Sequence, residues 1–310
     1  EAEQKTHKYF WNKLHKGQYD SIDIVIQKLH AIYQKDPRDF KLAAHLGFAY
    51  AWKITERRRI KDLSPDISSS ADLAQRYFEE AVKLNPNDPR LLGFKSGFML
   101  VNGIRHQDKK LKRKGYFLGK KSIRHWPSFN LFSIGYVMSG IEYQKKRYKE
   151  ALEMQWKNLE ECLCRKIDRQ NPDLSDIDQI PNRVKNDYKK NRACTNSWIA
   201  PHNVEGFLLN LGDMLVKNGD LAAASEVYNA IEKIDEYDEW PYKDKLTKRV
   251  QNINENMENF RRPSQTLKDN QQVFLRTTYA CMACHQKSEK EFTNQNHSIP
   301  LSEETYFLED

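Results

Sequence analysis

The fold is decided by residues 206–231, which read GFLLNLGDMLVKNGDLAAASEVYNAI. Apolar side chains recur every three or four residues on either side of Asn218-Gly219-Asp220, and this spacing puts them on one face of a helix. The first face holds Leu208, Leu211, Gly212 and Leu215, and the second holds Ala224, Tyr228 and Ile231. The Asn-Gly-Asp sequence between them is typical of a turn. The stretch therefore predicts a hairpin of two helices.

Similar hairpins are expected upstream of this stretch. Residues 40–50 (FKLAAHLGFAY) and 71–84 both carry apolar or small side chains three or four positions apart. The second of these helices ends in a turn at residues 85–89. Pro89 suits the start of the next helix, because the N–H that proline lacks would be unpaired there. A further hairpin is predicted over residues 127–164.

The alternation of small and large residues in these hairpins resembles the tetratricopeptide-repeat (TPR) family. Small residues stand where two helices would cross, large residues fill the gaps beside them, and prolines mark helix ends. These positions are Gly47, Ala74, Ala81, Gly212 and Ala224, then Tyr50, Phe78 and Tyr228, then Pro37, Pro86 and Pro127. The prolines are 49 and 41 residues apart, whereas a regular array repeats about every 34 residues. The resemblance covers roughly residues 10–252. It implies an all-α fold in which residues 1–252 form a degenerate TPR-like solenoid that binds protein segments.

Two segments interrupt the expected array. Residues 57–69 contain several serines and a proline, and are expected to be an insertion between the two helices of one hairpin. Residues 165–200 are polar and punctuated by proline, which predicts a long loop with at most one short helix. Near the end of this loop, Cys194 could form a disulfide with Cys162 or Cys164. The alternative is a buried free thiol.

The composition excludes several classes of protein. The chain has 310 residues with only 12 Gly and 11 Pro, which excludes collagen-like and low-complexity chains and disfavours a β-sandwich. The mean hydropathy is −0.85. No apolar run approaches the roughly 20 residues that span a bilayer, so no transmembrane segment is expected.

The net charge of +8 is concentrated in one part of the chain. Residues 105–124 contain nine Lys or Arg, and Asp108 is the one acidic residue among them. Such a stretch is either a solvated helix face or a surface that binds nucleic acid, anionic lipid or an acidic protein face. Its aromatic residues belong to no recognisable nucleic-acid-binding motif, so no nucleic-acid partner is predicted.

The sequence Cys281-Met282-Ala283-Cys284-His285 has the C-x-x-C-H pattern by which haem c is attached. Its two thiols lie three residues apart on one turn, so each can add to one vinyl group of the haem. The imidazole of His285 follows at once and would bind the iron from the proximal side. The motif predicts one covalent haem c in the C-terminal segment 253–310. That segment is also expected to contain a further helix over residues 264–276.

Two alternatives remain for the paired cysteines. A redox dithiol usually opens a helix of a βαβ unit, and no strand pattern precedes Cys281. A zinc site needs a second pair of closely spaced ligands, and Cys162 and Cys164 have the wrong spacing and lie far upstream.

The sixth iron ligand is expected to come from outside the motif. The 25 residues after His285 contain no Met, but they include His297 in the sequence NHSIP. This stretch resembles those in multihaem cytochromes that complete bis-histidine ligation, so His297 is the first candidate. Other candidates are His202, Met214 and His125. Alternatively, His297 is an exposed tail residue, and an open iron would allow peroxidase-like or gas-binding chemistry.

These motifs leave three functions open. The chain could dock on a larger redox complex and relay electrons through its haem, or it could be an assembly subunit of a respiratory complex in which the haem is structural, or a haem peroxidase. No nucleophile elbow, phosphate loop or His-Glu metal pair is present in the helices, so no catalytic residue is predicted. The resemblance to c-type cytochromes implies protein partners and a periplasmic or equivalent extracytoplasmic location.

Overall fold

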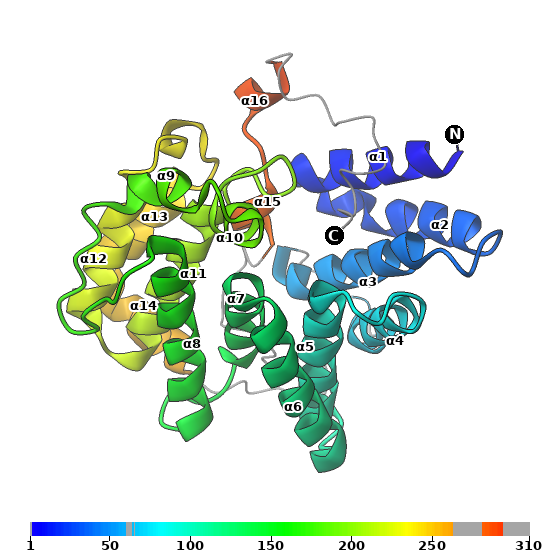
Figure 1. The fold of residues 1–310 in the computed structure, drawn as a ribbon, viewed down its shortest axis with the longest axis horizontal. Helices are drawn as coiled ribbons and strands as arrows, with labels where there is room; N and C mark the ends of the chain where they lie inside the picture. Colours follow the sequence, from blue (N-terminus) through cyan, green and yellow to red (C-terminus); the bar gives the residue numbers. More distant parts are fainter. Residues whose placement is uncertain (1, 60–63, 65, 263–280, 294–310) are drawn as a thin grey trace.

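The computed structural model describes residues 2–59, 64, 66–262 and 281–293. The regular secondary structure of these residues is entirely helical. Helices α1 to α14 follow one another around an arc, and α15 lies between its two ends (Figure 1). The predicted all-α fold is therefore confirmed.

The helices differ widely in length. Their bounds are α1 Ala2–His15, α2 Ile22–Tyr33, α3 Phe40–Thr55, α4 Ser69–Leu84, α5 Pro89–Arg105, α6 Lys109–His125, α7 Pro127–Met138, α8 Lys146–Leu163, α9 Ile180–Val184, α10 Tyr188–Cys194, α11 Asn203–Asn218, α12 Leu221–Ile231, α13 Lys243–Gln251, α14 Ile253–Arg261, α15 Met282–His285 and α16 Glu289–Thr293. The longer helices pack as consecutive pairs: α1 with α2, α3 with α4, α5 with α6, α7 with α8, and α11 with α12. Helix α5 also packs on α4 and α7, which joins neighbouring pairs into one body.

The small residues predicted at helix crossings lie against the large ones. A Cβ added to Gly212 of α11 would lie 2.2 Å from Tyr228 Cε1 of α12. A Cβ on Gly47 of α3 would lie 2.8 Å from Phe78 Cε1 of α4. Real Cβ atoms do not approach carbon so closely, so glycine lets each ring fill the crossing.

The α5–α6 pair is a hairpin that the sequence analysis did not predict. A Cβ on Gly115 would lie 2.9 Å from Leu100 N, and one on Gly119 would lie 2.7 Å from Ser96 Oγ. Helix α6 thus approaches α5 through its glycines. In the sequence, the many lysines and arginines of α6 indicate a charged surface and give no sign of the glycine face that packs on α5.

The interruption at residues 165–200 is more ordered than predicted. It contains a 3₁₀ turn at Ile177–Gln179 and two short helices, α9 and α10, so the expectation of at most one helix is wrong. Its apolar side chains are buried, namely Ile167, Leu174, Ile177, Ile180 and Val184. A disulfide joins Cys194 at the end of α10 to Cys162 in α8, and Cys164 is free and exposed.

The C-terminal segment returns to the helical array. Helices α14 and α15 both pack on α11, and α15 also contacts α1 (Figure 1). The helix predicted over residues 264–276 and the candidate ligand His297 lie outside the described residues. Among the helices that the structure describes, none is both long enough and apolar enough to cross a membrane.

Candidate functional site

A cavity of about 310 Å³ is enclosed by α1, α3, α5, α7 and α11. Its wall is mostly apolar, and its aromatic residues include Trp52, Phe94, Phe98, Phe129, Phe132 and Phe207. Cys281, Cys284 and His285 form part of the same wall. Cofactor sites are typically apolar cavities of about this size with a few polar groups. The C-x-x-C-H residues therefore lie together on the wall of a cavity suited to a flat, apolar cofactor.

The first turn of the motif is held by Glu56, which directly follows α3. Its Oε1 accepts hydrogen bonds from the N–H groups of Cys281, at 2.7 Å, and Met282, at 3.1 Å. These amides begin a short helix and would otherwise lack acceptors. Burial raises the pKa of Glu56, and the guanidinium of Arg59, at 2.6 Å from the carboxylate, opposes that shift.

The other side of the motif is held through backbone atoms. The Cys284 carbonyl accepts from the His202 N–H at 3.0 Å, and the Ala283 carbonyl accepts from Trp240 Nε1 at 2.8 Å. Helix α11 comes so close that a Cβ on Gly206 would lie 2.3 Å from Cys284 Sγ. The position of α15 thus depends on residues more than forty positions away along the chain.

His285 is oriented by a backbone carbonyl. Its Nδ1 lies 2.8 Å from the oxygen of Ile199, which can only accept a hydrogen bond. The proton must therefore be on Nδ1, and the lone pair of Nε2 is available to a metal. Burial lowers the pKa of His285, which favours this neutral form.

The side chains of Cys281 and Cys284 are shielded from water, which favours the neutral thiol over the thiolate. Burial raises the pKa of Cys281 to about 12, and it raises the pKa of Cys284 further. No disulfide joins them. A redox dithiol acts through an accessible thiolate, which this burial disfavours. Among the residues that the structure describes, no group of three or more His, Cys, Asp or Glu is placed to hold a metal ion. The surroundings of Cys281 and Cys284 therefore support neither a redox dithiol nor a zinc site.

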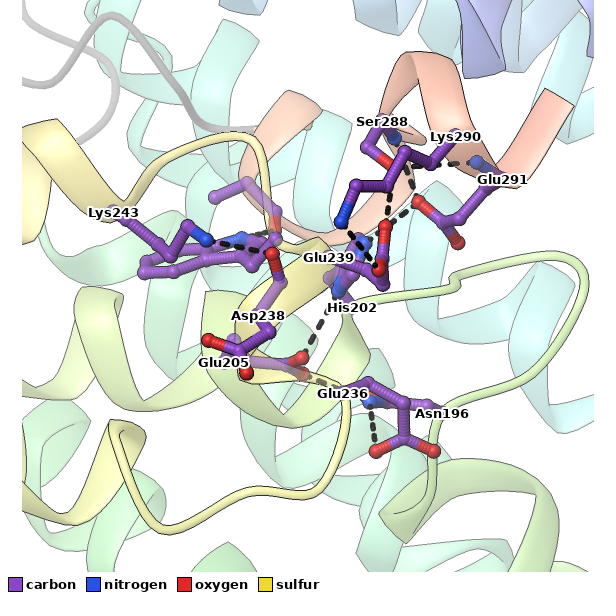
Figure 2. Close-up of polar contacts among 12 residues, drawn as sticks. Asn196, His202, Glu205, Glu236, Asp238, Glu239, Lys243, Ser288, Lys290 and Glu291 are labelled. Carbon is purple, nitrogen blue, oxygen red and sulfur yellow. Dashed lines mark hydrogen bonds and ion pairs between the residues drawn. The ribbon is translucent and has the colours of Figure 1, made fainter. Parts of the chain in front are cut away.

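His202, one of the fallback iron ligands, is engaged elsewhere. Its Nδ1 lies 2.9 Å from Glu205 Oε1, and its Nε2 lies 3.1 Å from Glu291 Oε2 in α16 (Figure 2). Burial alone would lower its pKa, but the hydrogen bonds to both carboxylates raise it to about 9. The ring is therefore a cation that fastens the segment after the motif to α11, and it does not line the cavity.

The other two fallback candidates also lie away from the cavity wall. Met214 is fully buried in α11 without lining the cavity, and His125 is exposed at the end of α6. Among the described residues of the wall, His285 is the one histidine and there is no methionine. The structure therefore brings Cys281, Cys284 and His285 together on the cavity wall, whereas the side chains of His202, Met214 and His125 do not line the cavity.

Several residues that position the motif were not predicted. Glu56, Ile199, Gly206 and Trp240 carry no local pattern that marks them, since their role depends on contacts across the fold. The chain matches no protein-family model, and no curated protein matches it.

Proposed function

We propose that this chain is a monohaem c-type cytochrome on a TPR-like scaffold that relays electrons between protein partners in the periplasm or an equivalent compartment. The observation that carries the proposal is the placement of Cys281, Cys284 and His285 on the wall of one aromatic cavity. The hydrogen bond from His285 Nδ1 to Ile199 adds to it, because it prepares the opposite nitrogen for a metal.

The residues present fit a haem in three respects. Each cysteine can add its thiol across a vinyl C=C bond, which forms a C–S bond and leaves the thiol hydrogen on the neighbouring carbon. His285 would offer Nε2 as an iron ligand, and the apolar side chains of the wall would pack on the porphyrin ring. When bound, the haem supplies one-electron chemistry.

The direct experiment is the intact mass of the mature protein under denaturing conditions. We expect the mass of the polypeptide plus one haem, with a Cys281→Ala/Cys284→Ala variant at the bare polypeptide mass. Cys164→Ser is the control, because its thiol is exposed and does not line the cavity, and it should keep the haem. A wild-type protein at the bare polypeptide mass, purified from a host that matures c-type cytochromes, would overturn the proposal.

His297 remains our proposed sixth ligand. His297→Ala should turn a low-spin spectrum into a high-spin one that responds to carbon monoxide, with the covalent haem retained. His125→Ala, on the exposed end of α6, should leave the spectrum unchanged. If the wild-type iron is already high-spin and binds carbon monoxide, the peroxidase alternative is favoured instead. A low-spin haem that exchanges no electrons with redox proteins would favour the assembly subunit.

A basic groove supports an acidic protein partner. It is lined by Lys109, Lys112, Arg113, Lys145, Arg147, Arg261 and Arg262, and Glu142 is the one acidic residue among the described residues of its lining. Phe117, 58% exposed, adds an apolar contact surface. Val137 of α7 lines both this groove and the aromatic cavity. A partner docked there would lie one helix away from the cofactor.

The disulfide supports the proposed location. Cys162–Cys194 closes a 32-residue separation in a chain that also carries the haem motif. Structural disulfides form and persist in oxidising compartments, and they are rare in the cytosol.

A further inference from the structure

The two ends of the aromatic cavity differ in chemistry. At one end, Cys281 Sγ lies 3.1 Å from Thr55 Oγ1 at the end of α3, and the phenol of Tyr136 in α7 is nearby. At the other end lie Arg90 at the start of α5, Ser128 at the start of α7, and Arg192 on α10. Cys281 and the two guanidinium groups therefore lie toward opposite ends of the cavity.

The separation of the two ends follows from helix geometry. Ser128 and Tyr136 both line the cavity and are eight residues apart on α7, which corresponds to about 12 Å at 1.5 Å per residue. Arg90 and Phe98 span the same number of residues on α5. This length is comparable to the distance across a porphyrin from its vinyl edge to its carboxylate edge.

The polar end has more positive than negative charge. The guanidinium groups of Arg90 and Arg192 each lie 5.9 Å from the centre of the Trp126 ring, and Lys189 Nζ lies 5.8 Å from it. Among the described residues, Asp88 is the carboxylate that pairs with Arg90, with Oδ1 2.9 Å from its Nε. Burial, and the like charge of Arg90 beside it, lower the pKa of Arg192 to about 10. The cluster is thus a partly desolvated cation site that an anion would stabilise.

Arg192 is held in place but keeps donors for a ligand. Its one hydrogen bond within the described part of the chain joins Nη1 to Tyr188 Oη at 3.3 Å. Two residues later, the Cys194–Cys162 disulfide ties α10 to α8. A guanidinium carries five N–H donors in a planar fork that matches a carboxylate.

We propose that Arg192, supported by Arg90, binds the two carboxylates of a ligand whose opposite edge faces Cys281 and Cys284. This inference rests on the proposed function, in which that ligand is haem and the carboxylates are its propionates. The cavity then recognises the haem at both edges, covalently at the vinyl edge and ionically at the propionate edge.

The test compares haemin with haemin dimethyl ester, which lacks the two negative charges. The Cys281→Ala/Cys284→Ala full-length chain is refolded with each, and their dissociation constants are measured from the Soret band. Haemin should bind roughly tenfold tighter or more, because hydrogen bonds to charged groups contribute this much. Adding Arg192→Gln should bring the ratio close to one, whereas Arg124→Gln, at an exposed position of α6, should leave it unchanged.

A second measurement uses the holoprotein and does not depend on refolding. Carbodiimide coupling of an amine to the propionates is followed by the mass of the haem peptide after proteolysis. The propionates should be protected in the wild type and coupled in Arg192→Gln, and Arg192→Lys should be intermediate. If the ester binds as tightly as haemin, or the propionates couple equally in all variants, the inference is wrong while a haem-containing intact mass still supports the function. A chain that carries no haem and binds neither porphyrin overturns both.

Discussion

Gly206 sets how closely the haem motif can approach α11. In Gly206→Ala the new methyl would lie 2.3 Å from Cys284 Sγ and 2.8 Å from Cys284 N, so α15 must move. We expect a loss of about 1–3 kcal/mol in the free energy of unfolding and a lower fraction of chains with attached haem. Urea unfolding and intact mass measure the two effects.

The matched control for the unfolding measurement is Gly97→Ala in α5, which is not used for haem content because Gly97 lines the aromatic cavity. There the added methyl would meet only Val137 Cγ2, at 3.1 Å, which can shift slightly. If both substitutions lower the free energy of unfolding equally, the close contact between Gly206 and Cys284 does not determine how α15 packs on α11.

His202 should make the stability of the protein depend on pH. Its pKa is about 9 in the folded chain and near 6.5 when unfolded, so the folded state binds the proton more tightly. The stabilisation is then fully present below about pH 6.5 and is lost as the pH rises through about 9, by up to about 3 kcal/mol. Urea unfolding between pH 6 and 9.5 should show this decline. His202→Gln should remove it and His125→Gln should retain it, and an unchanged decline in His202→Gln would falsify the assignment.

The sequence reveals residues whose role depends on near neighbours. The spacing of Cys281, Cys284 and His285 predicts a common function, and the structure places all three on the wall of one cavity. The supporting residues could not be predicted in this way. Glu56 is 225 positions from Cys281, whose amide donates a hydrogen bond to it, and Ile199 is 86 positions from His285. A carboxylate that caps one short helix looks in the sequence like any other carboxylate.

At the scale of single elements, the position of α10 depends on the disulfide between Cys194 and Cys162. Cys194→Ser opens the bond to Cys162, and the unfolded chain regains the freedom of a loop of about 32 residues. The free energy of unfolding should fall by about 3 kcal/mol. Arg192 should also lose its fixed position, so the propionates should become accessible to carbodiimide. Cys164→Ser removes an exposed free thiol and should change neither measurement. If both variants unfold at the same urea concentration, the disulfide does not stabilise this element.

Whole helices were predictable where an apolar face was long. The 206–231 hairpin became α11 and α12 because its stripes of Leu, Ala and Tyr continue over several turns. The short helices α9 and α10 were missed because two turns cannot establish a period. Their order comes instead from burial of scattered apolar residues such as Ile180 and Val184, together with the disulfide.

For the whole molecule, the proposed function and the position of the basic groove together predict how charged reagents would exchange electrons with a bound haem. Oxidation of the reduced holoprotein by ferricyanide should slow by about tenfold at low salt in Lys112→Glu/Arg113→Glu, because the groove attracts anions. Oxidation by a cationic cobalt complex should not slow. Lys185→Glu/Lys233→Glu changes the net charge equally at exposed sites outside the groove, and should have a smaller effect. Stopped-flow rates that fall equally in both variants would argue against a role for the groove.

Because α15 packs against both α1 and α11, haem attachment and folding would have to occur in a fixed order. Cys284 is buried and Cys281 is partly buried, and the groups that cover them come from α3 and α11. An attachment enzyme needs its two thiols and histidine on an accessible, extended chain. On the proposed function, haem must therefore be ligated while α15 is still undocked, and closure of the arc comes second. A chain that folds before haem arrives hides its own attachment site, so supply of the cofactor competes in time with folding.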